Sequence, residues 1–394
     1  MDNNTNNNTE KPIFEFAEEI STVVESRDPV IVGITHGDIN GVGYETILKS
    51  LNNKEITDLI IPVIYGSARV AVYFQRRLAL EDFTFNSVSN AAQINKKRVN
   101  IVNITNQEIK IESGKPSKQM GELAVIALEH AVGDIKKGLL DVIVTAPINK
   151  DNTQNEHFNF VGHTEFFADS FGVKHEDCLM FMVHDKLRIG LVTNHLPLNK
   201  IAATLNKNLI THKIKIMAQS LRRDFGIVKP KIAVLSLNPH AGDNGFLGNE
   251  EKTMIEPAIA ECYEQGIMVY GPYASDGFFG TGKQYYFDGV LAMYHDQGMT
   301  PFKALSENGG VNFTAGLPIV RTSPAHGTAY DIAGKGEASP TSMTEAMFLA
   351  CDIYRNRKAH DLMYENPLKI GIAQEIIGIA KDDETIDPFA EGDM

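Results

Sequence analysis

Short apolar runs alternate with longer amphipathic segments along most of the chain. The first run, Pro29–Thr35, has the length of a buried strand, and a polar turn with glycines leads from it to a helical segment at Glu45–Leu51. Further runs of strand length are Leu59–Tyr65, Arg98–Ile104, Asp141–Thr145, Arg188–Thr193, Lys231–Leu237 and Gly289–Tyr294. Further segments of helical length are Ala68–Leu80, Lys118–Lys137, Asn206–Phe225, Gly248–Gln265 and Thr341–Arg357. This alternation predicts an α/β fold with a largely parallel sheet, interrupted by a polar, strand-poor stretch at Thr84–Lys97.

The chain contains no internal repeat and no linker that would divide it into separate folding units. We therefore expect two lobes that share a sheet, one interrupting the other in sequence. Residues 1–28 begin with an Asn-rich stretch without an apolar core, which predicts a disordered leader and not a signal peptide. Residues 381–394 are acidic and are expected to form a frayed tail.

Charge and cysteine content exclude several classes of protein. The 37 basic and 50 acidic residues leave a formal net charge of -13, which argues against a partner such as nucleic acid or an anionic membrane. No apolar run approaches the roughly 20 residues of a membrane span. The cysteines Cys178, Cys262 and Cys351 form no CxxC pair, which favours a reducing compartment and predicts a cytoplasmic protein.

Three histidines follow predicted strands directly. They are His195, His240 and His295, and ligands collect at the carboxyl ends of parallel strands. Three neutral imidazoles that leave positions open are typical ligands of a catalytic divalent metal, although each alone is equally typical of an ordinary surface histidine. The neighbouring Asp243 and Asp296 are candidates to orient an imidazole or to complete the ligand set.

Two further clusters suggest an anionic ligand. His163 and Thr164 follow Gly162 at the start of a predicted helix, where backbone N–H groups favour an anion, although Thr164 could equally be a plain N-cap. Lys303, Asn312 and Arg321 lie among small and apolar residues, where an unpaired cation is costly. A phosphate or carboxylate ligand would relieve that cost, and so would an ion pair with Asp331 or Glu307.

The segment 325–336 is rich in glycine and small residues, as expected of a loop that approaches a nucleotide or of an ordinary glycine-rich loop. No GxGxxG fingerprint follows any predicted strand, and Gly37–Gly43 lacks its spacing, so a classical Rossmann domain is not expected. The residues alone therefore indicate a metal-assisted α/β enzyme that acts on an anionic small molecule.

Seven motifs, found in family order, resemble those of the 4-hydroxythreonine-4-phosphate dehydrogenase family between about Val30 and Tyr354. They are Gly37-Asp-Ile-Asn-Gly-Val-Gly43, Thr145-Ala-Pro-Ile-Asn-Lys150, Gly162-His-Thr-Glu-Phe-Phe167, Asn194-His-Leu-Pro-Leu198, Leu237-Asn-Pro-His-Ala-Gly242, Leu291-Ala-Met-Tyr-His-Asp-Gln-Gly298 and Gly316-Leu-Pro-Ile-Val-Arg-Thr-Ser323. The segment 325–336 also resembles a loop of isocitrate and isopropylmalate dehydrogenases, a superfamily that holds NAD without a Rossmann fingerprint.

The resemblance implies a three-layer, two-lobed α/β fold of the isocitrate dehydrogenase type with a cleft between the lobes. A cofactor-side lobe would comprise residues 29–150 and 315–380, and a metal, substrate and dimerisation lobe residues 151–314. NAD or NADP and one divalent metal, such as Zn, Co, Mg or Mn, are implied cofactors, and one metal ligand would come from the neighbouring subunit of a homodimer. The implied site residues are His195, His240 and His295 for the metal, His163, Thr164, Lys303, Asn312 and Arg321 for the substrate, and His326, Gly327, Thr328 and Asp331 for the dinucleotide.

The implied reaction oxidises 4-phosphooxy-L-threonine to a 3-oxo acid, which loses carbon dioxide to give 3-amino-2-oxopropyl phosphate in vitamin B6 (pyridoxal phosphate) biosynthesis. Asp243, Asp296 or a metal-linked water would accept the hydroxyl proton. The chain departs from the usual family pattern at Ile39, Asn40 and Tyr44, at 337–339 and at 105–118. The alternatives are the same chemistry on another four-carbon acid phosphate such as 4-phospho-D-erythronate, a phosphotransacetylase-like acyltransferase, and an inactive relative.

Overall fold

The computed structural model describes residues 28–155, 158–307 and 309–365. The predicted leader, apart from Asp28, and the predicted acidic tail lie outside the described residues. Within the described ranges, no helix combines the length and the hydrophobicity that crossing a membrane requires.

The strands form one sheet of twelve, in the order β3-β4-β2-β1-β5-β12-β11-β6-β7-β10-β8-β9. Their bounds are β1 Val30–Thr35, β2 Ile60–Gly66, β3 Phe85–Val88, β4 Val99–Asn103, β5 Val142–Thr145, β6 Leu179–His184, β7 Leu187–Leu191, β8 Lys231–Leu235, β9 Met268–Tyr273, β10 Gly289–Ala292, β11 Val311–Ala315 and β12 Val320–Pro324. Pairing is parallel from β3 to β12 and again from β7 to β9. Between these halves, β11 and β6 make the antiparallel pairings.

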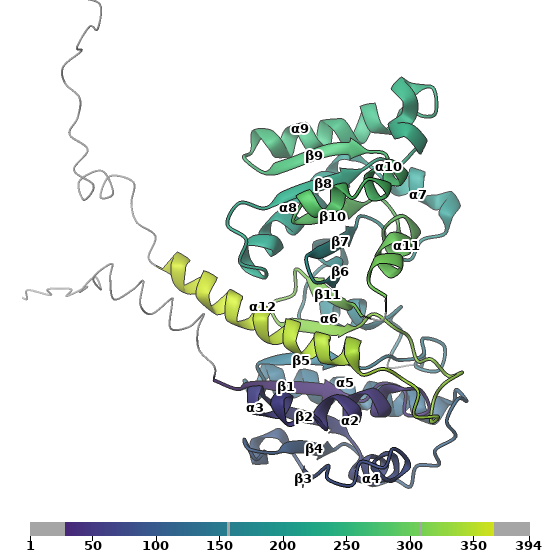
Figure 1. Ribbon diagram of the computed structural model, residues 1–394, viewed down its shortest axis with the longest axis vertical. Helices are drawn as coiled ribbons and strands as arrows, with labels where there is room; N and C mark the ends of the chain where they lie inside the picture. Colours follow the sequence, from purple (N-terminus) through teal and green to yellow (C-terminus); the bar gives the residue numbers. More distant parts are fainter. Residues whose placement is uncertain (1–27, 156–157, 308, 366–394) are drawn as a thin grey trace, which may run out of the picture.

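Helices cover both faces of this sheet, as Figure 1 shows. The α-helices are α2 Gly43–Leu51, α3 Lys54–Leu59, α4 Ala68–Arg77, α5 Lys118–Lys136, α6 His163–Ser170, α7 Leu198–Thr204, α8 Lys207–Arg223, α9 Glu256–Glu264, α10 Ser275–Gly280, α11 His295–Leu305 and α12 Thr341–Glu365. Short 3-10 turns are η1 Ala91–Gln93, η2 His175–Asp177, η3 Pro239–Gly245 and η5 Lys283–Tyr286, and η4 Glu251–Ile255 is a π-helical turn.

Alternate residues of a strand enter different hydrophobic cores. In β5, Val142 and Val144 belong to one core cluster and Ile143 to another. In β6, Phe181 joins the first cluster, whereas Met182 joins a third. Strands buried on both faces have continuous apolar sequences, which explains why the run at β5 was recognised, although β6 has the same character and was not predicted. The structure therefore confirms the predicted three-layer α/β fold with a largely parallel sheet.

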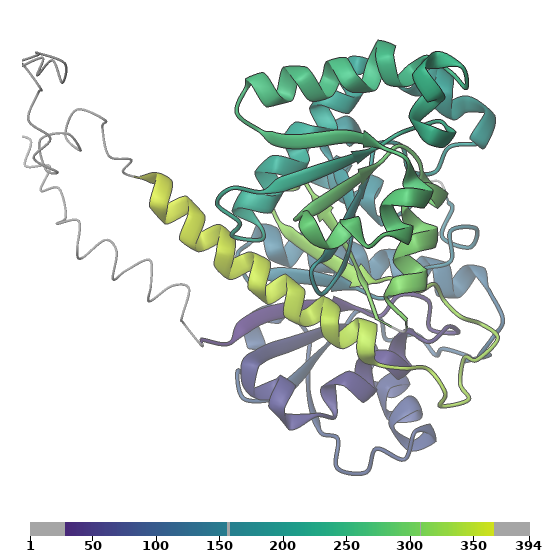
Figure 2. The same ribbon diagram turned by 45° about the horizontal axis from the view of Figure 1, so that its top comes forward.

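Helix α12 extends beyond the predicted end at Arg357 to Glu365 and crosses the junction between the two halves (Figure 2). It packs against β5, β11 and β12 and also contacts α2 and α8. Sequence patterning missed β3, which lies inside the predicted strand-poor stretch Thr84–Lys97. Within the described sheet, β3 pairs with β4 alone and forms the edge. Its four residues include the polar Asn86 and Ser87, so it lacks the continuous apolar run of a buried strand. The lobe boundaries after residues 28, 150, 314 and 380 stay a prediction.

The sheet brings the loops after its parallel strands to one side of the molecule. In Figure 1, α7, α10 and α11, which follow β7, β9 and β10, lie on the same side as the segment between β12 and α12. The strands of the two halves run in opposite directions within the sheet, and its accumulated twist rotates their carboxyl ends toward a shared side. The candidate site lies on that side.

Candidate functional site

His195 and His295 come together at the ends of two neighbouring strands. His195 follows β7, His295 is the first residue of α11 after β10, and β7 pairs in parallel with β10. Their ring centroids are 5.6 Å apart. The Nδ1 atom of His295 lies 2.7 Å from Oδ1 of Asp296. Because a carboxylate oxygen accepts, Nδ1 carries the proton and Nε2 keeps its lone pair for a metal.

His240 lies apart from this pair, on a turn with an unusual backbone. Residues 240–244 all have positive φ, and Glu251 anchors the start of the turn by accepting hydrogen bonds from the backbone N–H groups of Leu237 and Asn238 at 2.9 and 2.8 Å. His240 and Asp243 are exposed. No three His, Cys, Asp or Glu side chains gather closely enough to hold a metal in the described part of the chain. One chain therefore presents two of the predicted metal ligands together and the third separately.

The environment of His195 favours the neutral imidazole that a metal requires. Burial lowers the pKa of His195, and the charges of Lys150 and His295 lower it further, against an opposing effect of Glu165. Two neutral imidazole nitrogens, with a carboxylate hydrogen-bonded to one of the rings, suit a divalent metal ion of intermediate softness such as Zn²⁺. The donor set of this pair therefore fits the metal that the resemblance implies.

Arg321 is a buried cation on β12. Its guanidinium donates hydrogen bonds to Thr145 Oγ1 at 2.6 Å and Thr314 Oγ1 at 3.3 Å, and its Nε has no partner. The residue is 2 % exposed, and none of the ion pairs between described residues involves it. Burial lowers the pKa of Arg321 to about 9, against an opposing effect of Glu165. Such a cation needs an anion to offset its lost hydration.

His163 lies near Arg321 at the start of α6. Burial lowers the pKa of His163 well below its ordinary value, and the charges of Arg321 and Lys150 lower it further. Its Nε2 is buried without a hydrogen-bond partner. Gly162, and not Thr164, occupies the N-cap, and no side chain caps the helix, so the plain N-cap interpretation of Thr164 is wrong. Thr164 lies in the first turn, with its hydroxyl not used for capping.

The other predicted substrate residues differ in exposure. Asn312 is half-buried on β11, and its Oδ1 lacks a partner. Lys303 is exposed on α11, which corrects the expectation that it is embedded like Arg321. A long chain with a charged end can remain hydrated at the rim of a cavity, so Lys303 carries no burial cost.

Lys303 and His326 line one cavity of about 300 Å³, formed between α2, the end of α11 and the segment 325–339. Burial lowers the pKa of His326; its Nδ1 lies 2.9 Å from the carbonyl oxygen of Gly327, and its Nε2 has no partner. The carbonyl oxygen of Thr328 accepts a hydrogen bond from the backbone N–H of Val42, whereas Gly327 and Asp331 are exposed. Small residues and an unpartnered imidazole fit the edge of a dinucleotide.

Sequence reasoning missed Lys150 and Glu165 as site residues. Lys150 affects the pKa values of both His163 and His195, and Glu165 affects those of His195 and Arg321, so each is close enough to act electrostatically on both groups. Lys150 ends the motif that follows β5, and Glu165 lies inside the motif of His163. Their positions within those motifs could have identified them as candidate site residues from the sequence.

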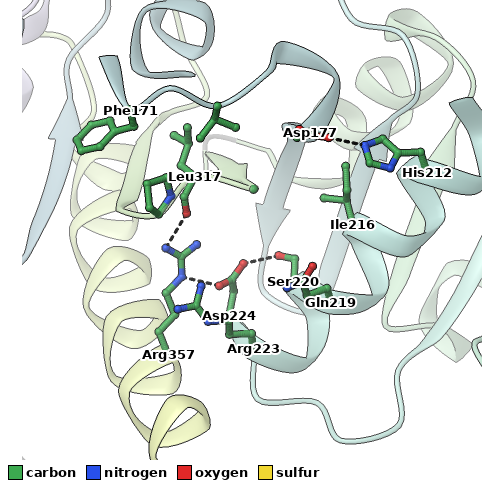
Figure 3. Close-up of a pocket in the computed structure, with 13 residues that line it drawn as sticks. Phe171, Asp177, His212, Ile216, Gln219, Ser220, Arg223, Asp224, Leu317 and Arg357 are labelled. Atoms are coloured by element: carbon green, nitrogen blue, oxygen red, sulfur yellow. Dashed lines mark hydrogen bonds and ion pairs between the residues drawn. The ribbon is translucent and has the colours of Figure 1, made fainter. Parts of the chain in front are cut away.

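A second cavity, of about 520 Å³, lies between α8, α12 and the loop before β12 (Figure 3). Its charged groups are satisfied within the protein. Arg357 donates to Asp224 at 2.6 Å and to the carbonyl oxygen of Leu317 at 3.1 Å, and Asp224 also accepts from Ser220. His212 lies 2.8 Å from Asp177. These pairings explain the polar lining without a ligand, in contrast to the unpartnered groups around Arg321.

Comparison with known proteins identifies the family. The model of the family described as pyridoxal phosphate biosynthetic protein PdxA matches residues 58–350. A 4-hydroxythreonine-4-phosphate dehydrogenase of Bacteroides thetaiotaomicron is 51% identical over 338 residues, which are 86% of this chain and 92% of the relative. The chain belongs to this family.

Two further relatives bear on the fold and the substrate. The crystal structure of a 4-hydroxythreonine-4-phosphate dehydrogenase from Klebsiella pneumoniae has a TM-score of 0.71 and 34% identity, covering 83% of this chain and 99% of that one. A protein of Cutibacterium acnes named as a putative D-threonate 4-phosphate dehydrogenase is 36% identical over 330 residues, covering 82% of this chain and 94% of the relative. The predicted family resemblance and fold class are confirmed, and the relatives are named as dehydrogenases.

Proposed function

We propose that this protein oxidises the secondary alcohol of 4-phosphooxy-L-threonine, with NAD or NADP as hydride acceptor and one divalent metal. The product is the 3-oxo acid, which decarboxylates to 3-amino-2-oxopropyl phosphate in pyridoxal phosphate biosynthesis. The observation that carries this function is the buried, unpaired Arg321 beside the neutral His163. Named relatives at 51% and 39% identity support it.

Arg321 and its neighbours form the part of the site suited to a phosphate dianion. Arg321 already donates to two hydroxyl groups and has Nε free, so a phosphate oxygen would gain a charge-assisted hydrogen bond and offset the burial of the cation. His163, Thr164 and Asn312 add polar groups around it, and Lys303 at the cavity rim adds a second cation. Holding the phosphate positions the alcohol for reaction.

His195 and His295 would hold the metal, with Asp296 orienting His295. A bound divalent metal lowers the pKa of the substrate alcohol and stabilises negative charge on its oxygen, and a bound nicotinamide accepts hydride. Because Asp296 already accepts the Nδ1 proton of His295, we assign it an orienting role. Asp243 and a metal-linked water stay the candidate proton acceptors.

Two exposed apolar side chains favour a homodimer with shared sites. Leu198 is 75% exposed three residues after His195, and Phe246 is 85% exposed six residues after His240. We take these two side chains as part of the surface that a second copy of the chain covers. Because one chain brings only His195 and His295 together, we propose that a second copy supplies His240 as the third ligand.

The cavity beside His326 would receive the dinucleotide. Its walls include Val42 and Ala325, which permit close approach, and His326 offers an unpartnered Nε2. Gly327, Thr328 and Asp331 extend the same segment. We also propose a cytoplasmic location, because Cys178, Cys262 and Cys351 are free and buried, as expected in a reducing compartment.

The relative named for D-threonate 4-phosphate favours a second candidate, in which the same chemistry acts on a four-carbon acid phosphate without the amino group, such as 4-phospho-D-threonate or 4-phospho-D-erythronate. The test is the metal content of the purified protein together with kcat/KM for the three substrates, followed by NADH absorbance. A large preference for 4-phosphooxy-L-threonine is expected. A preference for either acid phosphate would move the assignment to that substrate.

The same assay separates the remaining alternatives. An acyltransferase predicts no NADH signal and no loss of activity on metal removal, and an inactive relative predicts no turnover of any substrate. Reduction of NAD that disappears on chelation and returns with added metal would exclude both.

A further inference from the structure

Asp38 is a buried carboxylate, 1% exposed, in the turn between β1 and α2. Its Oδ1 accepts a hydrogen bond from the backbone N–H of Asn40 at 2.8 Å. Its Oδ2 accepts two side-chain hydrogen bonds, from Asn152 Nδ2 at 2.7 Å and from the Tyr330 hydroxyl at 2.8 Å. One oxygen atom therefore joins two segments that are far apart in sequence.

The two donors belong to opposite parts of the candidate site. Tyr330 lies in the segment 325–336, four residues after His326, which faces the proposed dinucleotide cavity. Asn152 lies two residues after Lys150, whose charge acts on His163 and His195. Asp38 thus joins the segment assigned to the hydride acceptor to the segment of Lys150, whose charge acts on the proposed substrate residue His163.

Backbone contacts hold the turn against the same two segments. The N–H of Asp38 donates to the carbonyl oxygen of Pro147 at 2.9 Å, and the N–H of Val42 donates to that of Thr328 at 3.0 Å. Gly37 has a φ of +67°, and a Cβ there would lie 2.3 Å from the Pro147 carbonyl oxygen. The backbones approach too closely at this position for any other residue, so the carboxylate is held in place.

In the hydrogen bond between Tyr330 and Asp38, the tyrosine hydroxyl is the donor and the carboxylate is the acceptor. Burial raises the pKa of Tyr330, and Asp38 raises it further, against opposing effects of Asn149 and Thr328, so the phenol keeps its proton and donates. Two donors on one oxygen also constrain each other's positions, because movement of either segment lengthens a bond to the same atom.

We propose that Asp38 is a positioning residue that ties the dinucleotide segment to the Lys150 segment, so that hydride acceptor and substrate are held at a defined separation. This inference rests on the proposed function for its catalytic meaning. Its mechanical part, the coupling of the two segments, holds for whatever ligands they bind.

Three variants separate the two links. Tyr330→Phe removes the hydroxyl that reaches Asp38 from the dinucleotide side, and Asn152→Ala removes the amide on the other side. Asp38→Ala removes the shared acceptor and so breaks both side-chain links at once. Tyr65→Phe is the matched control, because Tyr65 donates to Asp134 at 2.9 Å in a buried tyrosine–aspartate pair that involves neither segment.

Hydrogen–deuterium exchange of the full-length protein measures the coupling directly. Asp38→Ala should speed amide exchange in both 146–153 and 326–336, whereas Tyr330→Phe should do so mainly in 326–336 and Asn152→Ala mainly in 146–153. Tyr65→Phe should change neither segment. Unchanged exchange in both segments of Asp38→Ala, or of both single-link variants if Asp38→Ala does not fold, would overturn the proposal.

Ligand binding and kinetics test the catalytic part. Tyr330→Phe should raise the Kd for NAD, measured by calorimetry, and the KM for NAD roughly tenfold. Asn152→Ala should instead raise the KM for the phosphorylated substrate. A uniform fall in kcat with unchanged KM values would indicate a merely structural role. Absence of turnover in the wild type would overturn the proposed function, whereas the exchange experiment would still decide the coupling.

Discussion

The imidazole rings of His195 and His295 lie with centroids 5.6 Å apart because their strands, β7 and β10, are parallel neighbours. Each ring follows the carboxyl end of its strand, and Asp296 holds the Nδ1 atom of His295 at 2.7 Å. The sheet thereby creates a pair of nitrogen donors from residues that are distant in the chain. The first two predictions concern this pair.

Removing either ring should destroy metal binding. His195→Ala or His295→Ala is expected to weaken the affinity for Zn²⁺ on the order of 100-fold or more, because each removes a nitrogen donor. Calorimetric titration of the metal-free protein measures this effect. His130→Ala, at an exposed position on α5, is the control and should leave the affinity unchanged. Wild-type affinity in both site variants would contradict the assignment.

Asp296→Asn should weaken metal binding less than loss of a ligand, by roughly 10- to 100-fold, because it disturbs only the orientation and basicity of His295. The same titration applies, with Asp58→Asn on α3 as an exposed carboxylate control. If Asp296→Asn and the control bind the metal equally well, the carboxylate does not orient the ligand.

Arg321→Met should raise stability while weakening substrate binding. The substitution removes a buried cation that has no carboxylate partner, so the free energy of unfolding should rise by about 1–4 kcal/mol, and the KM for the phosphorylated substrate should rise on the order of 100-fold. Thermal unfolding and steady-state kinetics measure the two effects.

Arg357→Met is the matched comparison for Arg321→Met, because Arg357 is equally buried but paired with Asp224 at 2.6 Å. Its removal leaves a buried carboxylate unpaired and should lower stability by about 3–5 kcal/mol. A lower melting temperature for Arg321→Met as well would show that Arg321 is a structural cation.

His36 should make the protein sensitive to acid. Burial lowers the pKa of His36 to about 4, against backbone contacts at Gly37 and Leu123 that raise it. The unfolded chain therefore binds a proton between pH 6.5 and 4 that the folded chain does not, and stability falls with pH across this window by up to about 3 kcal/mol. His36→Leu should lose this component in denaturation curves measured at several pH values. An unchanged slope would show that His36 titrates normally in the folded state.

The sequence predicted the elements whose pattern is local. The buried strand at Pro29–Thr35 appears as β1, and the helix at Lys118–Lys137 as α5, because apolar runs and helical periodicity depend on neighbouring residues. Strands β3, β6, β9, β11 and β12 were not predicted. Strand β3 is short and lies at the sheet edge, so it lacks a continuous apolar run, whereas β6 has such a run and was overlooked. The antiparallel direction of β6 and β11 depends on distant partners. The unusual turn at His240 was not predicted either: residues 240–244 have positive φ, and the chain just before them is held by Glu251 from a later segment.

In the candidate site, too, some features follow from local sequence and others depend on tertiary structure. Motif composition alone was enough to name four of the candidates. His195 and His295 follow predicted strands, His163 lies at the start of a predicted helix, and Arg321 lies among small and apolar residues. Motif composition could not distinguish buried Arg321 from exposed Lys303, since both lie among small and apolar residues. The roles of Lys150 and Glu165 emerged only from their effects on neighbouring groups.

The sequence by itself determined the fold class, the family and most of the candidate residues, because these follow from short-range hydrophobic patterns and contiguous motifs. Only the tertiary structure decided that His195 and His295 form a pair without His240, that Arg321 is buried without a counter-ion, and that Asp38 joins Asn152 to Tyr330. Burial and charge coupling are properties of three-dimensional neighbourhood. They arise when the sheet order and its twist bring distant loops to one side, which no local pattern specifies.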